Sequence, residues 1–275
     1  MIFHGDARNV PLGDSSVDVV ITSPPYWGLR DYGVVGEIGS EPTPGEYVKA
    51  IIEVLNELRR VLVPDGNVFM VIGDKYARTG GVDRKVRGVG ADPGGRVHKR
   101  PVQRGVSGVA DGSLIGLPYR VALAAIDAGW LWRQDIVWSK PNPLPESVRR
   151  RCTRAHETIL HMTRTAQHYA RPTLKGGELG SDIWSIAVRG YRDPEAIATP
   201  AVYPEQLVER IIHNWCPPKG LVLDPFVGSG TTGVVAMRLG RQFYGLDINK
   251  SSVAAAQRRI ELMQDAQENY SYDLI

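Results

Sequence analysis

The segment TSPPYW, Thr22 to Trp27, combines hydrogen-bond acceptors with aromatic rings directly after an apolar run. The Ser23 hydroxyl and the Pro24 carbonyl can each accept a hydrogen bond, and the two prolines fix the backbone that carries them. Such acceptors would localise the lone pair of an amine conjugated to an aromatic ring and turn it toward an electrophilic carbon. Tyr26 and Trp27 supply flat rings on which a nucleobase swung out of a duplex can stack. In isolation, a Pro-Pro-aromatic segment also suits a rigid turn packed against the core.

A second segment, LDPFVGSGTT at residues 223–232, has the form of a strand, a tight glycine turn and a helix start. Gly228 and Gly230 allow the backbone to approach a bound molecule closely. Asp247 ends the next apolar run, where a carboxylate can accept hydrogen bonds from ribose hydroxyls. Together these features predict a nucleoside cofactor. The loop lacks the lysine of a triphosphate site, while Gly233 keeps dinucleotide binding, and with it a nicotinamide oxidoreductase, as an alternative.

Short apolar runs alternate with helical patterns along the chain, so that both segments follow strands. Strands are predicted at residues 2–4, 17–21, 67–72, 134–138, 157–162, 221–223 and 242–246, and helices at residues 47–62, 117–128, 203–215, 230–239 and 250–263. The alternation predicts an α/β fold with a doubly wound, mostly parallel sheet in one domain spanning residues 1–275. Ligands of such sheets bind at the carboxyl ends of the strands, which would bring the two segments together.

Basic residues are concentrated in two stretches of a chain whose formal net charge is only +3. Residues 77–106 and 139–175 each carry eight Lys or Arg against two acidic residues, a net charge of +6 per stretch, which leaves −9 for the remainder. Two such stretches in an otherwise acidic chain favour nucleic-acid binding over a merely solvated surface. Residues 79–112 are rich in Gly and Arg and poor in bulky apolar residues, and we expect a mobile basic loop there that clasps DNA.

The cysteines and histidines indicate neither disulfides nor a metal. Cys152 and Cys216 are too few and too isolated for a disulfide framework, and there is no signal peptide or long apolar span, so we expect a cytoplasmic protein without membrane contact. Cys152, His156 and His161 do not form a tight ligand cluster, and we expect no bound metal.

The segment DPFVGSGTT resembles the cofactor loop of the amino-methyltransferase family of DNA methyltransferases, and SPPY resembles the catalytic motif of that family. In this family Ser-Pro-Pro-Tyr tends to accompany methylation of cytosine N4, and Asp-Pro-Pro-Tyr that of adenine N6. Because the catalytic segment precedes the cofactor segment, the chain is similar to the circularly permuted β group. The resemblance implies a permuted Rossmann-like fold, S-adenosylmethionine as cofactor and double-stranded DNA as substrate, with a small target-recognition region at residues 165–198.

The residues that we expect to carry these activities fall into three groups. The catalytic group is Ser23, Pro24, Pro25 and Tyr26. The cofactor group is Asp6, Thr199, Pro200, Asp224, Pro225, Phe226, Gly228, Ser229, Gly230, Thr231, Thr232 and Asp247. The DNA-binding group is Trp27 in the base pocket with Arg84, Lys85, Arg87, Lys140, Arg149, Arg150, Arg151 and Arg154.

Several alternatives stay open at this stage. Adenine N6 methylation uses the same chemistry, and an RNA or protein methyltransferase would also exploit a Pro-Pro-Tyr corner. A cytosine-C5 enzyme is disfavoured, because its nucleophilic cysteine follows a proline, whereas Cys216 precedes Pro217. A nicotinamide oxidoreductase gives no role to the SPPY motif, and a catalytically inactive DNA-binding protein would have no need to keep it. Both a monomer and a homodimer are compatible with the sequence.

Overall fold

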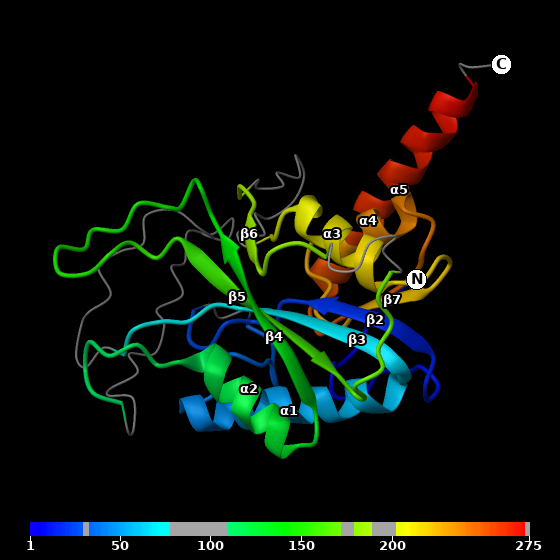
Figure 1. Ribbon diagram of the computed structural model, residues 1–275. Coiled ribbons are helices and arrows are strands. Elements are labelled where there is room, and N and C mark those ends of the chain that lie inside the picture. Colours follow the sequence, from blue (N-terminus) through cyan, green and yellow to red (C-terminus); the bar gives the residue numbers. More distant parts are fainter. Residues whose placement is uncertain (30–32, 78–108, 172–178, 189–201, 273–275) are drawn as a thin grey trace.

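The computed structural model describes residues 1–29, 33–77, 109–171, 179–188 and 202–272, with side chains as far as residue 265 in the last helix. Its framework is an eight-stranded sheet in the order β1-β8-β7-β2-β3-β5-β4-β6 (Figure 1). The strands are β1 (Ile2–His4), β2 (Val17–Thr22), β3 (Leu62–Ile72), β4 (Leu131–Ser139), β5 (His156–Thr163), β6 (Ile183–Ser185), β7 (Leu221–Asp224) and β8 (Gln242–Asp247).

Strand β5 runs antiparallel to β3 and β4, and the other strand pairs of the described sheet are parallel. The chain passes from β4 to β5 without a crossover helix and therefore returns in the opposite direction. In this hairpin Ser139 pairs with His156. The predicted doubly wound, mostly parallel α/β sheet is confirmed. Strand β6 was not predicted, because three residues are too few to display a periodicity.

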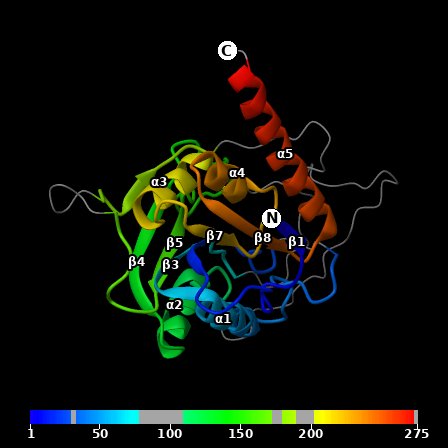
Figure 2. The same cartoon turned by 90° about the vertical axis from the view of Figure 1, so that its right-hand side faces the viewer.

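Helices cover both faces of the sheet (Figure 1, Figure 2). One face carries α1 (Pro44–Val61) and α2 (Leu117–Asp127). The other carries α3 (Glu205–Trp215), α4 (Thr231–Arg238) and α5 (Lys250–Tyr272), and the C-terminal part of α5 projects from the body. Each face has its own apolar core, which explains why the central strands are buried on both sides.

Helix α1 illustrates how local sequence sets an element. Thr43 caps its N-terminus in a capping box with Glu46, and a proline occupies the first turn. The buried side chains of Tyr47, Ile51 and Leu58 recur at helical spacing and face the sheet. These features hold α1 against β2 and β3. Strand β2, which ends at the start of the TSPPYW segment, is therefore packed against a helix.

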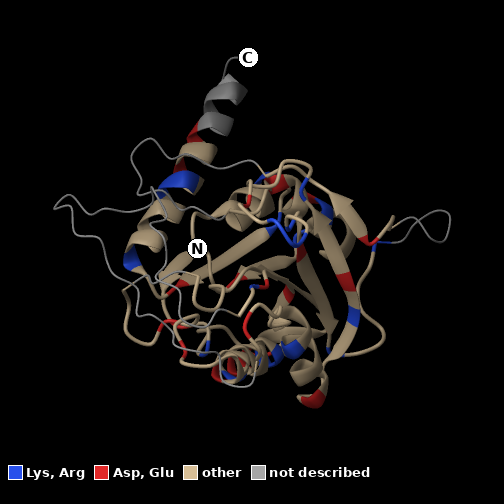
Figure 3. Ribbon diagram, turned by 90° about the vertical axis from the view of Figure 1, so that its left-hand side faces the viewer, with Lys and Arg blue, Asp and Glu red and all other residues tan. Residues whose placement is uncertain are grey.

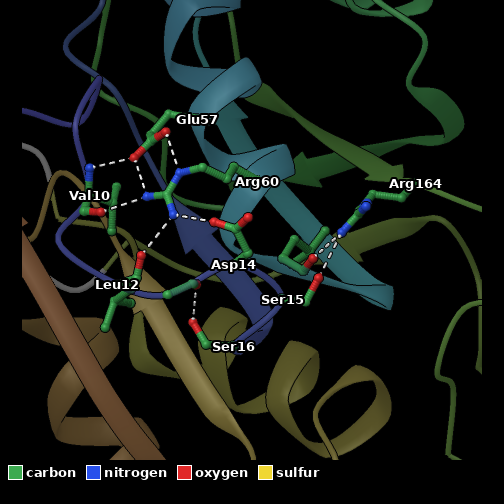
Figure 4. A network of polar contacts seen from close by, with 10 residues as sticks. Val10, Leu12, Asp14, Ser15, Ser16, Glu57, Arg60 and Arg164 are labelled. Atoms are coloured by element: carbon green, nitrogen blue, oxygen red, sulfur yellow. Dashed lines mark hydrogen bonds and ion pairs between the residues drawn. The ribbon is translucent and has the colours of Figure 1, made fainter.

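Arg60, in the last turn of α1, holds the segment that joins β1 to β2 (Figure 4). Its guanidinium donates to the carbonyls of Val10 and Leu12 at 2.9 Å, and it pairs with Asp14 and Glu57 at 2.7 Å. A guanidinium has five donors in a fixed fork, so one side chain can fix several points of a loop. This contact anchors the chain just before it enters β2.

Candidate active site

The catalytic and cofactor segments line one pocket at the carboxyl edge of the sheet. Strands β2 and β7 are parallel neighbours, so the residues that follow them emerge side by side. The pocket is lined by Ser23, Pro24, Pro25, Tyr26, Leu29, Glu37, Ile38, Val202, Tyr203, Phe226, Val227, Gly228, Ser229, Thr231, Asp247, Ile248, Asn249 and Ser252. The lining contains all four residues of the SPPY motif and five of the predicted cofactor residues. Of the remaining cofactor residues, Asp6, Asp224, Pro225, Gly230 and Thr232 do not line it, and Thr199 and Pro200 lie outside the described residues.

The glycine turn adopts backbone conformations that favour glycine. Gly228 has φ of 50° and Gly230 has φ of 79°. A Cβ on Gly230 would also lie 3.0 Å from the Cβ of Ala256, so the turn packs closely on α5. On the pocket side, the absence of a side chain at Gly228 leaves the backbone open to a ligand.

Asp247 ends β8 at the wall of the pocket. One carboxylate oxygen accepts the backbone N–H of Gly228 at 3.0 Å, and the other accepts that of Asn249 at 2.9 Å. A carboxylate oxygen can accept more than one hydrogen bond, so both retain capacity for ribose hydroxyls. Burial raises the pKa of Asp247 above its ordinary value, while the two backbone donors oppose that shift.

Asp224 lies behind the pocket and connects its walls. Its side chain is buried, and Oδ1 accepts the hydroxyl of Thr22 at 2.7 Å and the backbone N–H of Phe226 at 3.1 Å. Oδ2 accepts the hydroxyls of Tyr203 at 2.9 Å and Thr232 at 2.7 Å. Burial raises the pKa of Asp224, and these hydrogen bonds oppose the shift. Asp224 and Thr232 thus organise the pocket from behind.

Tyr26 links the pocket to a pair of charged residues. Its hydroxyl donates to Glu157 at 2.5 Å, and Glu157 forms an ion pair with Lys140. The ammonium of Lys140 lies 4.5 Å from the ring centre of Trp138, and its side chain is only 18% exposed. Burial and the Glu157 charge raise the pKa of Tyr26 well above its ordinary value, so the phenol stays protonated at neutral pH. Lys140, predicted to contact DNA, is engaged in this pair.

Trp27 does not have the position expected for a base contact. Its side chain is 0% exposed, and its indole N–H donates to the carbonyl of Glu41 at 2.8 Å. The ammonium of Lys75 lies 4.4 Å from the ring centre. The prediction that Trp27 binds DNA is therefore wrong: the turn after Tyr26 directs this ring into the core, where the apolar area is buried and the N–H is paired.

Asp6 acts on the pocket only indirectly. Its carboxylate pairs with Arg8 at 2.7 Å, and Arg8 also donates to the carbonyl of Gly36 at 2.9 Å. Gly36 precedes Glu37 and Ile38, which line the pocket. In this structure Asp6 supports the pocket wall through Arg8, and the cofactor contact predicted for Asp6 stays a prediction.

Several lining residues were not identified from the sequence. They are Leu29, Glu37, Ile38, Val202, Tyr203, Val227, Ile248, Asn249 and Ser252. Glu37 and Ile38 lie in a connection without periodicity, so only the folded chain brings them to the pocket. The group that follows Asp247 had a usable signal, because residues directly after a parallel strand lie at the ligand-binding edge.

The basic residues of the β4–β5 connection lie at the same edge of the sheet. Figure 3 looks onto this edge, and Lys and Arg (blue) gather on loops beside the strand ends. Arg149 and Arg150 are exposed and Arg154 is half-buried. Arg151 pairs with Glu146 at 2.7 Å, and its guanidinium carbon lies 4.0 Å from the ring centre of Tyr76.

Other predicted DNA-binding segments are described only in part. Arg84, Lys85 and Arg87 lie outside the described residues, as does most of the expected loop at 79–112. The expected recognition region at 165–198 is described at residues 165–171 and 179–188, where it contributes β6 to the sheet.

Within the described ranges, no group of three or more His, Cys, Asp or Glu side chains is arranged to hold a metal ion. The helices of this part of the chain include none that is long and apolar enough to cross a membrane.

Comparison with known proteins identifies the family. A family model described as DNA methylase, of the N6/N4 type, matches residues 17–258. The chain belongs to this family. It is a DNA methyltransferase that uses S-adenosylmethionine, which removes the nicotinamide oxidoreductase from consideration.

Relatives of this methyltransferase include type II enzymes. It is 38% identical to the type II methyltransferase M.XycI of Xanthomonas campestris pv. cyanopsidis, over 94% of this chain and 87% of that protein. It is also 38% identical to M.SmaI of Serratia marcescens, over 94% and 90%. Among solved structures, the PvuII DNA methyltransferase (cytosine-N4-specific) has a TM-score of 0.70 at 22% identity, covering 96% of this chain and 89% of that one. The M1.HpyAVI–SAM complex has a TM-score of 0.58 at 20% identity, covering 94% and 98%. These two structures share its fold.

The pocket of the methyltransferase fits S-adenosylmethionine. The Asp247 carboxylate can accept from the ribose, the turn at Gly228 presents bare backbone, and the Phe226 side chain adds apolar surface. When bound, the cofactor supplies an electrophilic methyl group on sulfur. Ser23 and Pro24 line the same pocket, so their hydroxyl and carbonyl oxygens would lie on the side of the bound methyl donor.

Proposed function

We propose that this methyltransferase modifies the exocyclic N4 of cytosine within a specific site of double-stranded DNA. The observation that carries the proposal is Ser23, which occupies the first position of the SPPY motif in the pocket shared with the cofactor turn. In this family the Ser-Pro-Pro-Tyr form tends to accompany N4-cytosine methylation. Adenine N6 is the second candidate, since Ser23 can serve either amine.

Ser23 and Pro24 act on the amine of the flipped base. An amine conjugated to the ring has its lone pair delocalised, and acceptors at the Ser23 hydroxyl and the Pro24 carbonyl draw its two N–H groups into fixed directions. This orientation localises the lone pair and presents it to the methyl donor. The reaction then requires no covalent bond between the enzyme and the base.

Tyr26 forms a neutral wall for that base. Its hydroxyl is committed to Glu157 at 2.5 Å, which holds the ring in one orientation. A protonated phenol ring can stack on a nucleobase without placing a negative charge beside it. Because the Glu157 charge is balanced by Lys140, the base meets a surface with no unpaired charge from this network.

The exposed basic residues provide the contact with the DNA backbone. Arg149 and Arg150 lie on the connection between β4 and β5, at the edge where the pocket opens. Guanidinium groups in this position neutralise phosphates and keep the duplex over the pocket while the base is extruded. Because the substrate is DNA, we also propose a cytoplasmic location.

The test is transfer of a labelled methyl group to DNA. Purified enzyme is incubated with DNA and methyl-labelled S-adenosylmethionine, the DNA is digested to nucleosides, and the label is assigned by chromatography. Label in N4-methylcytosine supports the proposal, and label in N6-methyladenine replaces it with the second candidate. Absence of label in DNA contradicts both, and the same assay with RNA and protein acceptors then separates a methyltransferase with another substrate from a catalytically inactive DNA-binding protein. Methylome sequencing of DNA from an expressing cell then gives the target site.

A further inference from the structure

One carboxylate outside the pocket lining, that of Asp224, is hydrogen-bonded to three of the chain segments that build the pocket. Asp224 is bonded to Thr22, which precedes the SPPY motif. It also accepts hydrogen bonds from Phe226 in the cofactor turn and from Thr232 in α4. It is also bonded to Tyr203, which precedes α3 and lines the pocket.

We propose that Thr22 and Asp224 are positioning residues that set the distance between the acceptor amine and the methyl donor. The proposal rests on the proposed methyl transfer and adds a role for two residues that do not line the pocket. The hydroxyl of Thr22 and the backbone N–H of Phe226 meet on the same oxygen, Oδ1 of Asp224, at 2.7 and 3.1 Å. One atom therefore ties the start of the catalytic segment to the start of the cofactor turn.

The position of this contact in the sheet explains why it is needed. The paired register of β2 and β7 includes Val19 with Val222 and Val20 with Leu223. In this register the backbone pairing between the two strands ends at Val20 and Leu223. The side-chain hydrogen bond from Thr22 to Asp224 therefore joins the two strands at their carboxyl ends, nearer the pocket. The loops that follow are the two that must hold donor and acceptor in line.

The environment makes the contact stiff. Thr22 is 0% exposed and Asp224 is 1% exposed, so water does not compete for the hydrogen bond. A hydroxyl that donates to a carboxylate forms a stronger bond than one between neutral groups. Methyl transfer is sensitive to misplacement on the scale of an ångström, so loss of this bond would act on the rate before it acted on binding.

The test compares matched substitutions at the two oxygens of Asp224. Thr22→Val keeps the shape of the side chain and removes its hydroxyl, while Thr22→Ser keeps the hydroxyl. Thr232→Val removes a donor from Oδ2, on the cofactor side. Single-turnover rates of labelled methyl transfer and equilibrium dissociation constants for S-adenosylmethionine are measured for each, with melting temperatures as a check of folding.

We expect T22V to lower the single-turnover rate about tenfold with cofactor affinity within about twofold of wild type, and T22S to restore the rate. T232V should weaken cofactor binding more than it lowers the rate at saturation. A T22V enzyme with the wild-type rate overturns the proposal. A T22V enzyme that loses cofactor affinity and rate in the same proportions as T232V also overturns it. If T22V does not fold, Thr22→Ala is compared with T22S in the same way. A wild-type enzyme that transfers no methyl group refutes the proposed function instead, so the two failures are distinguishable.

Discussion

The two sides of the pocket are built differently. The cofactor side, from β7 through α4 to the end of β8, is one continuous stretch of chain whose polar groups are mostly buried and bonded to backbone or hydroxyl groups, as at Asp224 and Asp247. The base side draws Tyr26, Glu157 and Lys140 from separate parts of the chain and joins them through charges. The cofactor is always the same molecule, whereas the DNA side must be adjusted for each target.

This difference separates three measurable quantities. Changes to the acceptor residues should alter the rate, changes to the cofactor side should alter cofactor affinity, and changes to the exposed arginines should alter the salt dependence of DNA binding. A variant that altered the rate, the cofactor affinity and the salt dependence together would show that the two sides of the pocket do not act separately.

The largest effect is expected for Ser23→Ala. The substitution removes an acceptor for the reacting amine, so the single-turnover rate should fall about 100-fold, while cofactor affinity stays near that of wild type. Time courses of labelled methyl transfer, quenched at set intervals, measure the single-turnover rate, and calorimetry measures cofactor binding. Ser16→Ala is the control, because the Ser16 hydroxyl only donates to the Gly13 carbonyl on an exposed loop. Equal losses of rate and affinity in S23A would argue against a role confined to the acceptor.

Asp247→Asn should act in the opposite way. The amide keeps the shape but loses the charge that accepts from ribose, so the cofactor dissociation constant should rise about tenfold, with a smaller change in the rate at saturation. The raised pKa of Asp247 adds a pH test. The carboxylate takes up a proton at a higher pH than an ordinary Asp, so wild-type affinity should be constant above that pKa and fall as the pH drops through it. D247N should lack this dependence; if it titrates like wild type, Asp247 is not the group responsible.

Glu157→Gln should have a moderate effect on the rate. Tyr26 can still donate to the amide, but Lys140 loses its ion-pair partner in a half-buried position, and we expect a fall of about fivefold. Tyr26→Phe and the double variant complete a cycle. If Glu157 acts by orienting the Tyr26 ring, the double variant should be no slower than Y26F alone. Glu146→Gln is the matched control, because its partner Arg151 lies on the exposed loop. Additive losses in the cycle would mean that Glu157 acts independently of Tyr26.

The smallest effect is expected for the double substitution of Arg149 and Arg150 by Ala. Loss of two phosphate contacts should weaken DNA binding several-fold at moderate salt and reduce the slope of log affinity against log salt by about 2. Fluorescence anisotropy over a salt series measures the slope. Arg238→Ala should leave the slope unchanged, because Arg238, on α4, is paired with Glu205 and Glu209 of α3. An unaltered slope in the double variant would mean that Arg149 and Arg150 do not contact the DNA phosphates.

The contacts within the cofactor side are easier to anticipate from the sequence than those within the base side, for a physical reason. The turn, its glycines and the strand-end carboxylate lie close together in the chain, so spacing alone indicates their meeting. The contacts of Tyr26 with Glu157, and of Thr22 with Asp224, depend on strand order, which no local pattern reveals. Burial was equally hidden at Trp27, since an aromatic residue after the motif suits a base platform and a core equally well.

Most elements were also predicted, because buried parallel strands and amphipathic helices carry strong periodic signals. The antiparallel direction of β5 was not apparent from its composition; it follows from the connection that precedes it.

That connection has a structural consequence. Because Ser139 and His156 face each other across the ladder, the excursion at residues 140–155 leaves and rejoins the sheet at a single point. A segment attached in this way can be lengthened or exchanged at little cost in loop-closure entropy and without shifting a strand. The fold therefore provides an insertion site beside the pocket, where the chain can be lengthened or exchanged while the strands that carry the SPPY motif and the cofactor turn keep their positions.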